Sequence, residues 1–527
     1  MYEGNSSEEE DEEGGDEPDE PDEEEQLRTP NEYAKMFLNA AIADKRYIVD
    51  ETVLVNTVKR LPCDNCGAPA LGVTLTKKST AGGGVRFEYY CMNQHKNTWS
   101  STRWYGAKSL TGQLLVLCSL LAGLTYHQMA QFAKFLQLAF PARSTFFKLQ
   151  RLFYKPLKTY YSKSMEETRT QTRAKVVAVD TRFDSPGYCA SKATTVFMEY
   201  DTKAIVHAEF CDHRSTNRQS ATMEYHNIQR GLPAMKDLQV EEIVSDASSV
   251  IKAALGEEDT IFHSMDLWHK GKNIAEMVLT GAKNKDCRAL KKWAKPTVAH
   301  FWSCAVACKG DQEKMDRRWA GLLWHVQGIH EWTVGRCHHA PDKDASLPLL
   351  IEGSPDGEAF RKIIMNPNLL ASLEYYSRAR HTSSVENFFS HTLLHYAPKR
   401  IQFSYDGYCI RNMIAILDHN HNLTRADQLS SNGNPYINCQ LSRRTKEWVA
   451  YKRMEAKEYS YIPDLLCVCL DGVYGVGNHT ARLTDTGLYL RNLGKAQRKN
   501  PGAWTVFQQQ ESRGKHSSRQ EPNRATE

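Results

Sequence analysis

Three carboxylates lie at positions in the sequence from which they could form a single site. Asp180 closes the β-rich run "KVVAVD", Asp246 closes "EEIVSD", and Glu386 lies in "SSVENFF", where Val385 and Phe388 belong to one helical face. Carboxylates gathered from two strand ends and a helix repel one another unless a cation neutralises them, and oxygen ligands favour Mg²⁺ or Mn²⁺. The pattern predicts two such ions, an arrangement that suits in-line displacement at a phosphodiester.

Each of these acids taken alone is more simply explained as a turn or helix cap, and only their matching positions favour the metal site. A further acid, Asp184, is expected to shape the turn "DSPG" through its own hydrogen bonds. Asp266 ends another predicted strand, and His269 follows it three residues later. This pair is a secondary candidate that would support the metal site or bind substrate phosphate.

A tight cysteine pair and a later Cys/His pair predict a structural zinc site. Cys63 and Cys66 form the knuckle "CDNC", and Cys91 and His95 follow a predicted strand pair joined by the glycine-rich turn 82–84. Together they provide a tetrahedral Cys₃His set, and Zn²⁺ would stabilise a module too small for a large core. The alternative is that the four residues are unrelated, which requires that both closely spaced pairs arose by chance.

A weaker metal pattern lies in a tryptophan-rich stretch, 270–370, which is predicted to be helical. Its candidate ligands for a second zinc ion are His325, His330, Cys337 and His339. They include no tight knuckle, so core packing and surface histidines are the favoured interpretation. The tryptophans are expected to anchor a helical core.

A basic helical segment precedes the first predicted strand. The stretch 110–165 is predicted to be a helical block, and residues 123–155 within it have the rhythm of a helix-turn-helix, in which Pro141 ends one helix and Ser144 can cap the next. The first of these helices has an apolar face formed by Met129, Phe132, Ala133 and Leu136. The next is expected to meet DNA through Arg143, Lys148 and Arg151. An ordinary helical hairpin with a solvated basic face is the alternative.

The order of the predicted elements indicates the fold class. Three antiparallel strands follow residue 175, and helices then alternate with strands, which is the order of a ribonuclease H-like domain. We therefore expect an α/β protein: a ribonuclease H-like catalytic core with a large helical insertion, preceded by a small zinc module and a helical DNA-binding block. The expected segments are an acidic disordered tail (1–26), a zinc-ribbon-like module (27–105), the helical block (106–174), the first part of the core (175–269), the insertion (270–370), the last part of the core (371–425), a C-terminal segment (426–494) and a basic polar disordered tail (495–527).

Charge is distributed very unevenly along the 527 residues. Residues 1–25 hold 15 of the 63 acidic residues and no Lys or Arg, so the rest of the chain carries 48 acidic and 67 basic residues, a net charge of +19. Such a body suits a polyanion, and the acidic tail either screens it or only keeps the chain soluble. The apolar run 114–124 is too short to span a membrane, no signal peptide is visible, and the cysteines show no disulfide framework. These features favour the cytosol or nucleus.

Several stretches of the chain resemble the Kolobok superfamily of DNA transposases. They are "VDTRFDSPGYCASKATTVFMEYDTKAIV", "MDLWHKGKNI", "CHH" at 337–339 and "SSVENFFSHTLLHYAPKRIQFSYDGYCIRNMIAILDHNHNLTR", within about 175–425. The resemblance implies a cut-and-paste transposase of the nucleus that uses Mg²⁺ or Mn²⁺. It also implies that Asp180, Asp246 and Glu386 are its catalytic acids, with Asp266 and His269 as an auxiliary motif.

The chain departs from the family pattern around the first acid. It has "VDTRF" where relatives usually have Gly-Asp-Gly-Arg, and "SPGYCA" where Ser-Pro-Gly-His is more usual. Some relatives carry a THAP zinc finger, but the 24 residues between Cys66 and Cys91 are more typical of a zinc ribbon. The acids themselves are present.

The expected partner is double-stranded DNA, both the element's terminal repeats and the target. Lys399 and Arg400 would contact phosphates, with Tyr405 and Tyr408 available for stacking on bases. Transposition holds two element ends together, so a homo-oligomer is expected. The alternatives are a domesticated, transposase-derived, zinc-dependent DNA-binding protein without catalysis and, less favoured, a purely structural adaptor.

Overall fold

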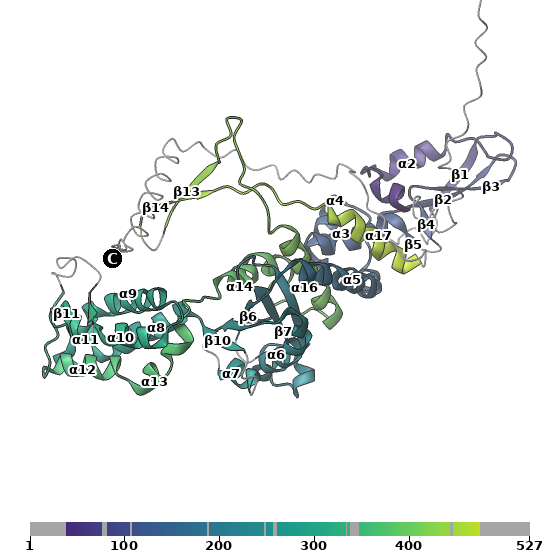
Figure 1. The fold of residues 1–527 in the computed structure, drawn as a ribbon. Helices are drawn as coiled ribbons and strands as arrows, with labels where there is room; N and C mark the ends of the chain where they lie inside the picture. The colour runs from purple at the N-terminus through teal and green to yellow at the C-terminus, as the bar shows by residue number, and fades with distance from the viewer. Residues whose placement is uncertain are drawn as a thin grey trace, which may run out of the picture.

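The computed structural model describes residues 38–75, 82–105, 108–186, 189–246, 249–256, 261–333, 335–337, 347–442 and 446–474. Both predicted disordered tails, 1–26 and 495–527, lie outside these ranges. The architecture is mixed α/β. A small Cys/His module lies at one end of the molecule, a mixed sheet at its centre, and a bundle of helices at the other end (Figure 1).

The N-terminal module is a three-stranded antiparallel sheet beside one helix, where the sequence predicted only a strand pair. It has a small core of its own, in which Val58, Phe87 and Tyr89 are buried. Its elements are α2 (Glu51–Val58), β1 (Ala70–Leu75), β2 (Arg86–Cys91) and β3 (Lys96–Ser100), followed by the short pair β4 (Trp104–Tyr105) and β5 (Lys108–Ser109).

The helical block consists of α3 (Leu110–Leu121), α4 (Tyr126–Leu136) and α5 (Arg143–Gln171). Most of the apolar run 114–124 lies in α3, which is largely buried, and no helix in the described ranges is long and apolar enough to cross a membrane. One prediction is wrong: Ser144 lies inside the first turn of α5, so it cannot be the cap. The predicted apolar face of α4 is largely exposed, since only Ala133 is buried and Phe132 is 55% exposed.

The central sheet has the strand order β10-β9-β6-β7-β8. The predicted three antiparallel strands are confirmed, and β9 runs parallel to both β6 and β10. The strands are β6 (Val176–Phe183), β7 (Lys192–Glu199), β8 (Ile205–Asp212), β9 (Glu242–Ser245) and β10 (Phe262–Met265). The prediction that the first strand ends at Asp180 is wrong, because its pairing with β7 continues to Phe183.

Helices cover both faces of this sheet. Ala178, Val196 and Val244 point into a core shared with α5, α14 (Ser383–Asn387), α16 (Tyr405–His421) and α17 (Tyr461–Tyr474). Val177 and Ile243 point the other way, towards α6 (Met223–Ala234) and α7 (Ser249–Leu255). Glu386 lies on α14, so the first face is the one that carries the predicted site.

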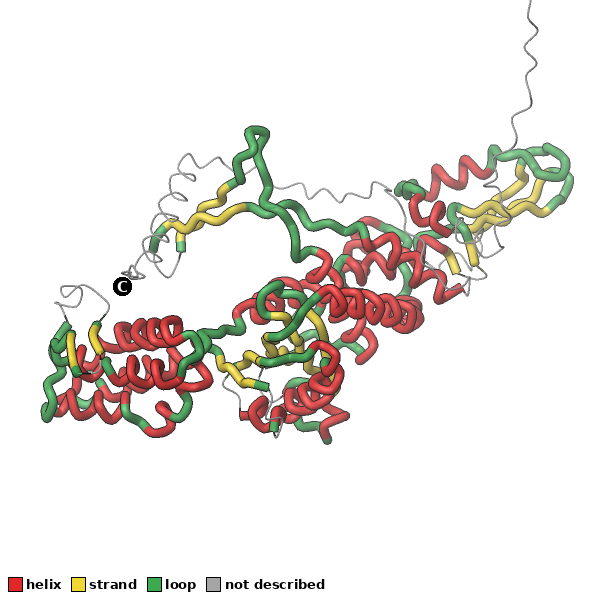
Figure 2. Tube along the Cα trace, viewed as in Figure 1, coloured by secondary structure: helices red, strands yellow, loops and turns green. Residues whose placement is uncertain are grey.

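The C-terminal helix α17 completes the first core, although the sequence beyond residue 425 gave little to predict. Leu465 and Cys469 are fully buried in it. Gly472 permits close packing on α5, since a Cβ there would lie 2.7 Å from Pro156. Between α16 and α17 the chain forms a two-stranded arm of β13 (Ile437–Leu441) and β14 (Trp448–Lys452), which stands away from the helices (Figure 2).

The predicted helical insertion forms a bundle with a separate hydrophobic core, which extends from Met265 to Tyr376. Trp293 and Trp319 anchor it as expected: both are buried, and their indole N–H groups donate to Pro348 O at 2.8 Å and Ile364 O at 3.0 Å. The elements are α8 (Leu267–Gly281), α9 (Leu290–Cys308), α10 (Gln312–Ala320), α11 (Leu322–His325), β11 (Glu331–Trp332), β12 (Gly335–Arg336), α12 (Pro355–Ile364) and α13 (Pro367–Leu370).

Candidate functional site

Strand register brings Asp180 and Asp246 to the same place on the sheet. In the parallel pair β6–β9, Ala178 is opposite Val244, and each acid lies two residues further along its own strand direction. Side chains alternate between the two faces of a strand, so both acids lie on the face of Ala178 and Val244. That face is the one covered by α14.

Glu386 lies on α14, the helix that covers the face of the sheet on which both aspartates lie. The predicted apolar face of this helix is confirmed, since Val385, Phe388 and Phe389 are buried against the sheet core. Burial of these side chains fixes the helix, while the Glu386 side chain stays 45% exposed. The helix continues as a π-helix over Phe388–Leu393, a local widening that often accompanies functional sites.

His269, on the first turn of α8, stands between two of the acids. Its Nδ1 lies 3.2 Å from Asp246 Oδ1, and its Nε2 lies 3.8 Å from Glu386 Oε1. One donor atom from each of these three residues falls within 4.8 Å of the others. Among the described residues, Asp180 is not part of this close group, so the structure gathers Asp246, His269 and Glu386 most tightly.

Asp266 lies directly behind this group and holds it in position. Its Oδ1 accepts hydrogen bonds from the backbone N–H groups of Trp268 and His269 at 2.7 and 2.9 Å, which caps α8. Its Oδ2 accepts from the backbone N–H and the hydroxyl of Thr382 at 2.7 and 2.9 Å. The residue is only 2% exposed. Both carboxylate oxygens are thus engaged, and Asp266 connects His269 to the segment that leads into α14.

The electrostatics of the site are those of carboxylates crowded together. Burial, and then the charge of Asp246, raises the pKa of Asp180 well above its ordinary value, although the backbone N–H of Thr181 donates to it at 2.7 Å. Burial also raises the pKa of Asp246, against the opposing effect of His269. Burial and the charge of Asp246 raise the pKa of Glu224, on α6. No sequence pattern had singled out Glu224.

A buried ion network fixes the returning chain to the sheet. Glu242, at the start of β9, is 1% exposed and accepts two hydrogen bonds from Arg380 and one from Arg378, each 3.0 Å long. Burial opposes its ionisation, but hydrogen bonds from Arg380, Ser264 and Arg378 outweigh burial and lower the pKa of Glu242. The chain that leaves the insertion is therefore held at Arg378 and Arg380, four and two residues before Thr382.

The four predicted ligands of the N-terminal module lie together. Cys63, Cys66, Cys91 and His95 each offer a donor atom within 4.8 Å of the others. The Sγ atoms of Cys66 and Cys91 are 3.7 Å apart, and His95 Nδ1 lies 3.3 and 3.8 Å from the Sγ atoms of Cys66 and Cys63. Tetrahedral zinc with Zn–S about 2.3 Å and Zn–N about 2.0 Å requires ligand separations of about 3.8 Å for S···S and about 3.5 Å for S···N. The cluster can therefore hold a metal such as zinc.

Two asparagines support this cluster from outside. Asn97 Nδ2 donates to Cys63 Sγ at 3.4 Å, and Asn93 Nδ2 donates to Cys66 Sγ at 3.3 Å. Burial opposes ionisation of Cys63, but the hydrogen bonds from Asn97 and from nearby backbone N–H groups outweigh it and lower the pKa to about 6. Thiolates are the form that binds metal, and partners of this kind orient and stabilise them.

The predicted DNA-contacting residues of α5 are all exposed. Arg143, Lys148 and Arg151 face solvent, and so do Lys155 and Lys158, which the sequence analysis did not single out. Spacings of three, four and three residues from position 148 to 158 put the last four cations on one face of the helix. The opposite face is buried through Phe146, Leu149, Phe153 and Leu157.

Lys399 and Arg400 are also exposed, in a loop tied to the hairpin of β6 and β7. The backbone N–H of Arg400 donates to Asp184 O at 2.9 Å. The Asp184 side chain accepts from the backbone N–H and hydroxyl of Ser191 across the same hairpin.

The expectation that Tyr408 is available for stacking is wrong. Tyr408 is 1% exposed, and its hydroxyl lies 2.7 Å from Thr194 Oγ1. It belongs to α16, whose residues are buried over most of its length against the sheet and α5. Tyr405 is half-buried, and its hydroxyl donates to Phe210 O at 3.0 Å, so this side chain too is held by the protein.

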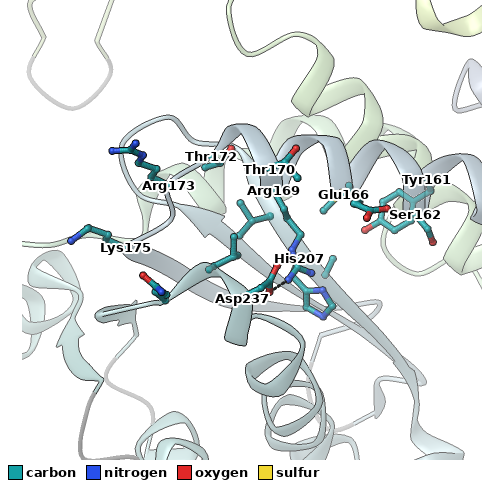
Figure 3. Close-up of a pocket in the computed structure, with 15 residues that line it drawn as sticks. Tyr161, Ser162, Glu166, Arg169, Thr170, Thr172, Arg173, Lys175, His207 and Asp237 are labelled. Atoms are coloured by element: carbon teal, nitrogen blue, oxygen red, sulfur yellow. Dashed lines mark hydrogen bonds and ion pairs between the residues drawn. The ribbon is translucent and has the colours of Figure 1, made fainter.

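A cavity of about 940 Å³ lies away from the acids, between the C-terminal half of α5 and β8. Figure 3 shows Arg173 and Lys175 at its rim, with Arg169 directed towards Asp237. Arg169 bonds both Asp237 and the carbonyl of Ala234, at 2.6 Å in the latter case. This cation fastens α5 to the end of α6, and the cavity contributes nothing to the carboxylate site.

Comparison with known proteins finds no match: no protein-family model matches this chain, and no curated protein does. The fold and the sites define a mixed α/β protein with a Cys₃His cluster that can hold a metal such as zinc, and with a second group of carboxylates and a histidine on its central sheet.

Proposed function

We propose that this protein is a DDE-type DNA transposase, which cleaves DNA at element ends and joins the freed 3′ hydroxyl to target DNA. The observation that carries the proposal is the close group of Asp246, His269 and Glu386, together with the strand register that puts Asp180 beside Asp246 on the same face of the sheet. Clustered carboxylates with raised pKa values are suited to divalent cations.

A ribonuclease H-like core is part of this proposal. Its support is the strand order, in which three consecutive antiparallel strands lie on one side and two parallel strands continue beyond β6 on the other. The helical bundle interrupts the chain between β10 and α14, where the sequence analysis predicted an insertion.

Asp180, Asp246 and Glu386 are the residues that would hold Mg²⁺ or Mn²⁺. When bound, such cations activate the attacking oxygen and stabilise charge on the leaving oxygen of a phosphodiester. His269 would orient Asp246 and Glu386, because it lies between them, and Asp266 keeps His269 in place. Asp266 is thus a positioning residue in this account.

Double-stranded DNA is the proposed partner, bound by the exposed cations of α5 and by Lys399 and Arg400. The loop with Lys399 and Arg400 is anchored beside the β6–β7 hairpin, because Arg182 donates to Ala397 O at 2.7 Å. Phosphate contacts would position the substrate, while the zinc module would recognise the terminal repeats. A nuclear location and a homo-oligomer that holds two element ends follow from this function.

Cleavage and strand transfer by the full chain on its own flanking DNA, in Mg²⁺ or Mn²⁺, test the proposal. We expect Asp180→Asn and Glu386→Gln to abolish both reactions and keep DNA binding, while Asp201→Asn, an exposed turn residue, behaves as wild type. Sequence-selective binding without any cleavage by the wild type would instead support a transposase-derived DNA-binding protein.

A further inference from the structure

Three side chains of the kinds that bind metals meet at the end of the helical insertion that lies farthest from the sheet (Figure 1). His325 is the last residue of α11, His330 precedes β11, and Cys337 follows β12. Each offers a donor atom within 4.8 Å of the others, and Cys337 Sγ lies 3.3 Å from His325 Nδ1. The sequence suggested these residues only weakly, and His339, the fourth candidate, lies outside the described residues.

The backbone around the cluster fixes where the three side chains emerge. The N–H of Cys337 donates to His330 O at 2.8 Å, next to the register pairs of β11 and β12. A tight turn follows His325, in which the N–H of Gly328 donates to His325 O at 3.0 Å with φ +81° at the glycine. Local hydrogen bonds thus bring a helix end and both arms of a hairpin to one point.

The surroundings of the three side chains are typical of a structural metal site, because they are partly shielded from solvent and packed on the core of the insertion. All three residues are partly buried. The His325 ring packs edge-on against Trp293, a core residue of the insertion, at 5.6 Å, and against the His330 ring at 5.1 Å. A ligand bound here would connect the hairpin directly to the insertion core.

Donor chemistry selects the metal. Two imidazoles and a thiolate suit a borderline cation such as Zn²⁺ and are poor ligands for Mg²⁺ or Ca²⁺. For zinc, tetrahedral ligands require a S···N separation of about 3.5 Å, close to the observed 3.3 Å. A hairpin of two-residue strands has little stability of its own, so a cross-link at its base has a clear physical role.

We propose that His325, His330 and Cys337 bind a structural zinc ion that fastens the β11–β12 hairpin to α11 and Trp293. Three protein ligands leave the fourth position of the tetrahedron to another donor. The site is independent of the carboxylates and of the proposed catalytic function.

Zinc content of the purified full chain, measured by native mass spectrometry, tests the proposal. The wild type is expected to bind two zinc ions, His330→Ala and Cys337→Ser one, and Cys189→Ser, which changes an exposed cysteine outside both clusters, two. Cys91→Ser should also bind one, and Cys91→Ser combined with His330→Ala none. A wild type that binds a single zinc, lost in Cys91→Ser and kept in His330→Ala, would overturn the proposal.

Cobalt substitution distinguishes loss of a ligand from misfolding. In the Cys91→Ser background, bound Co²⁺ should show a thiolate charge-transfer band that disappears with Cys337→Ser, while circular dichroism of the helices is unchanged. A band that persists without Cys337 would assign the metal to other residues and refute the site.

Discussion

Zinc removal should unfold the N-terminal module while the central sheet stays folded. The module's fully buried apolar core is small: Val58, Phe87 and Tyr89 are each no more than 3% exposed. Burial of side chains of this kind contributes about 1.5–3 kcal/mol each, so about 5–9 kcal/mol together, before the cost of ordering the chain. Structural zinc contributes about 10–16 kcal/mol in comparable small domains, so the metal dominates.

Hydrogen exchange on the full chain with and without a zinc chelator measures this effect. A loss of about 4 kcal/mol of local stability corresponds to a roughly thousandfold fall in amide protection, and we expect at least that in β2. Amides of β6 should keep their protection, because the sheet has a separate core.

Cys91→Ser should reproduce the effect of the chelator, and Cys189→Ser should not. Cys91 is fully buried within the cluster, whereas Cys189 is exposed and distant from it in the sequence. If β2 stayed equally protected in chelator and in Cys91→Ser, the module would be stable without metal, contrary to this prediction.

Three further predictions concern DNA binding, pH and the buried ion network. Lys148→Ala combined with Arg151→Ala should weaken DNA binding and lower the salt slope by about 2, measured by fluorescence anisotropy, with Lys291→Ala as a control that leaves the slope unchanged. Asp180 has a raised pKa in the folded state, so its stabilising contribution is complete below its unfolded pKa and is lost as pH rises through the folded value. Without added Mg²⁺ or Mn²⁺, Asp180→Asn should therefore gain stability relative to wild type as pH rises above the unfolded pKa of about 3.9. Thermal unfolding that shows no such change with pH would contradict this. Glu242→Gln should lower the free energy of unfolding by about 2–4 kcal/mol in urea, because it weakens three charge-assisted hydrogen bonds to partly exposed arginines; an effect under about 0.5 kcal/mol would contradict this.

The sequence predicted the sheet well because its signals are local. Runs rich in β-branched and apolar residues, separated by turns, identified β6 to β8, and Asp246 and Asp266 each directly follow a strand as expected. The sequence placed the end of β6 at Asp180, but the strand is longer. Its pairing with β9 ends at Ala178, while its pairing with β7 continues to Phe183, and a sequence does not display how far such pairing extends.

Other features depend on contacts that a sequence does not display. Glu224 reaches the acids from a helix with no recognisable motif, and the arginines that hold Glu242 lie more than 130 residues beyond it. Tyr408 has an aromatic ring that could stack on a base, but it is buried, because α16 is covered on nearly all sides. Long-range packing decides these positions.

Calorimetric titration of Mn²⁺ into the full chain, with its zinc clusters loaded, measures whether the acids of the central sheet form a divalent-cation site. Asp180→Asn and Glu386→Gln are each expected to weaken Mn²⁺ binding at least tenfold, and Asp201→Asn is expected to leave it unchanged. Equal Mn²⁺ affinity in the wild type, Asp180→Asn and Glu386→Gln would contradict this expectation.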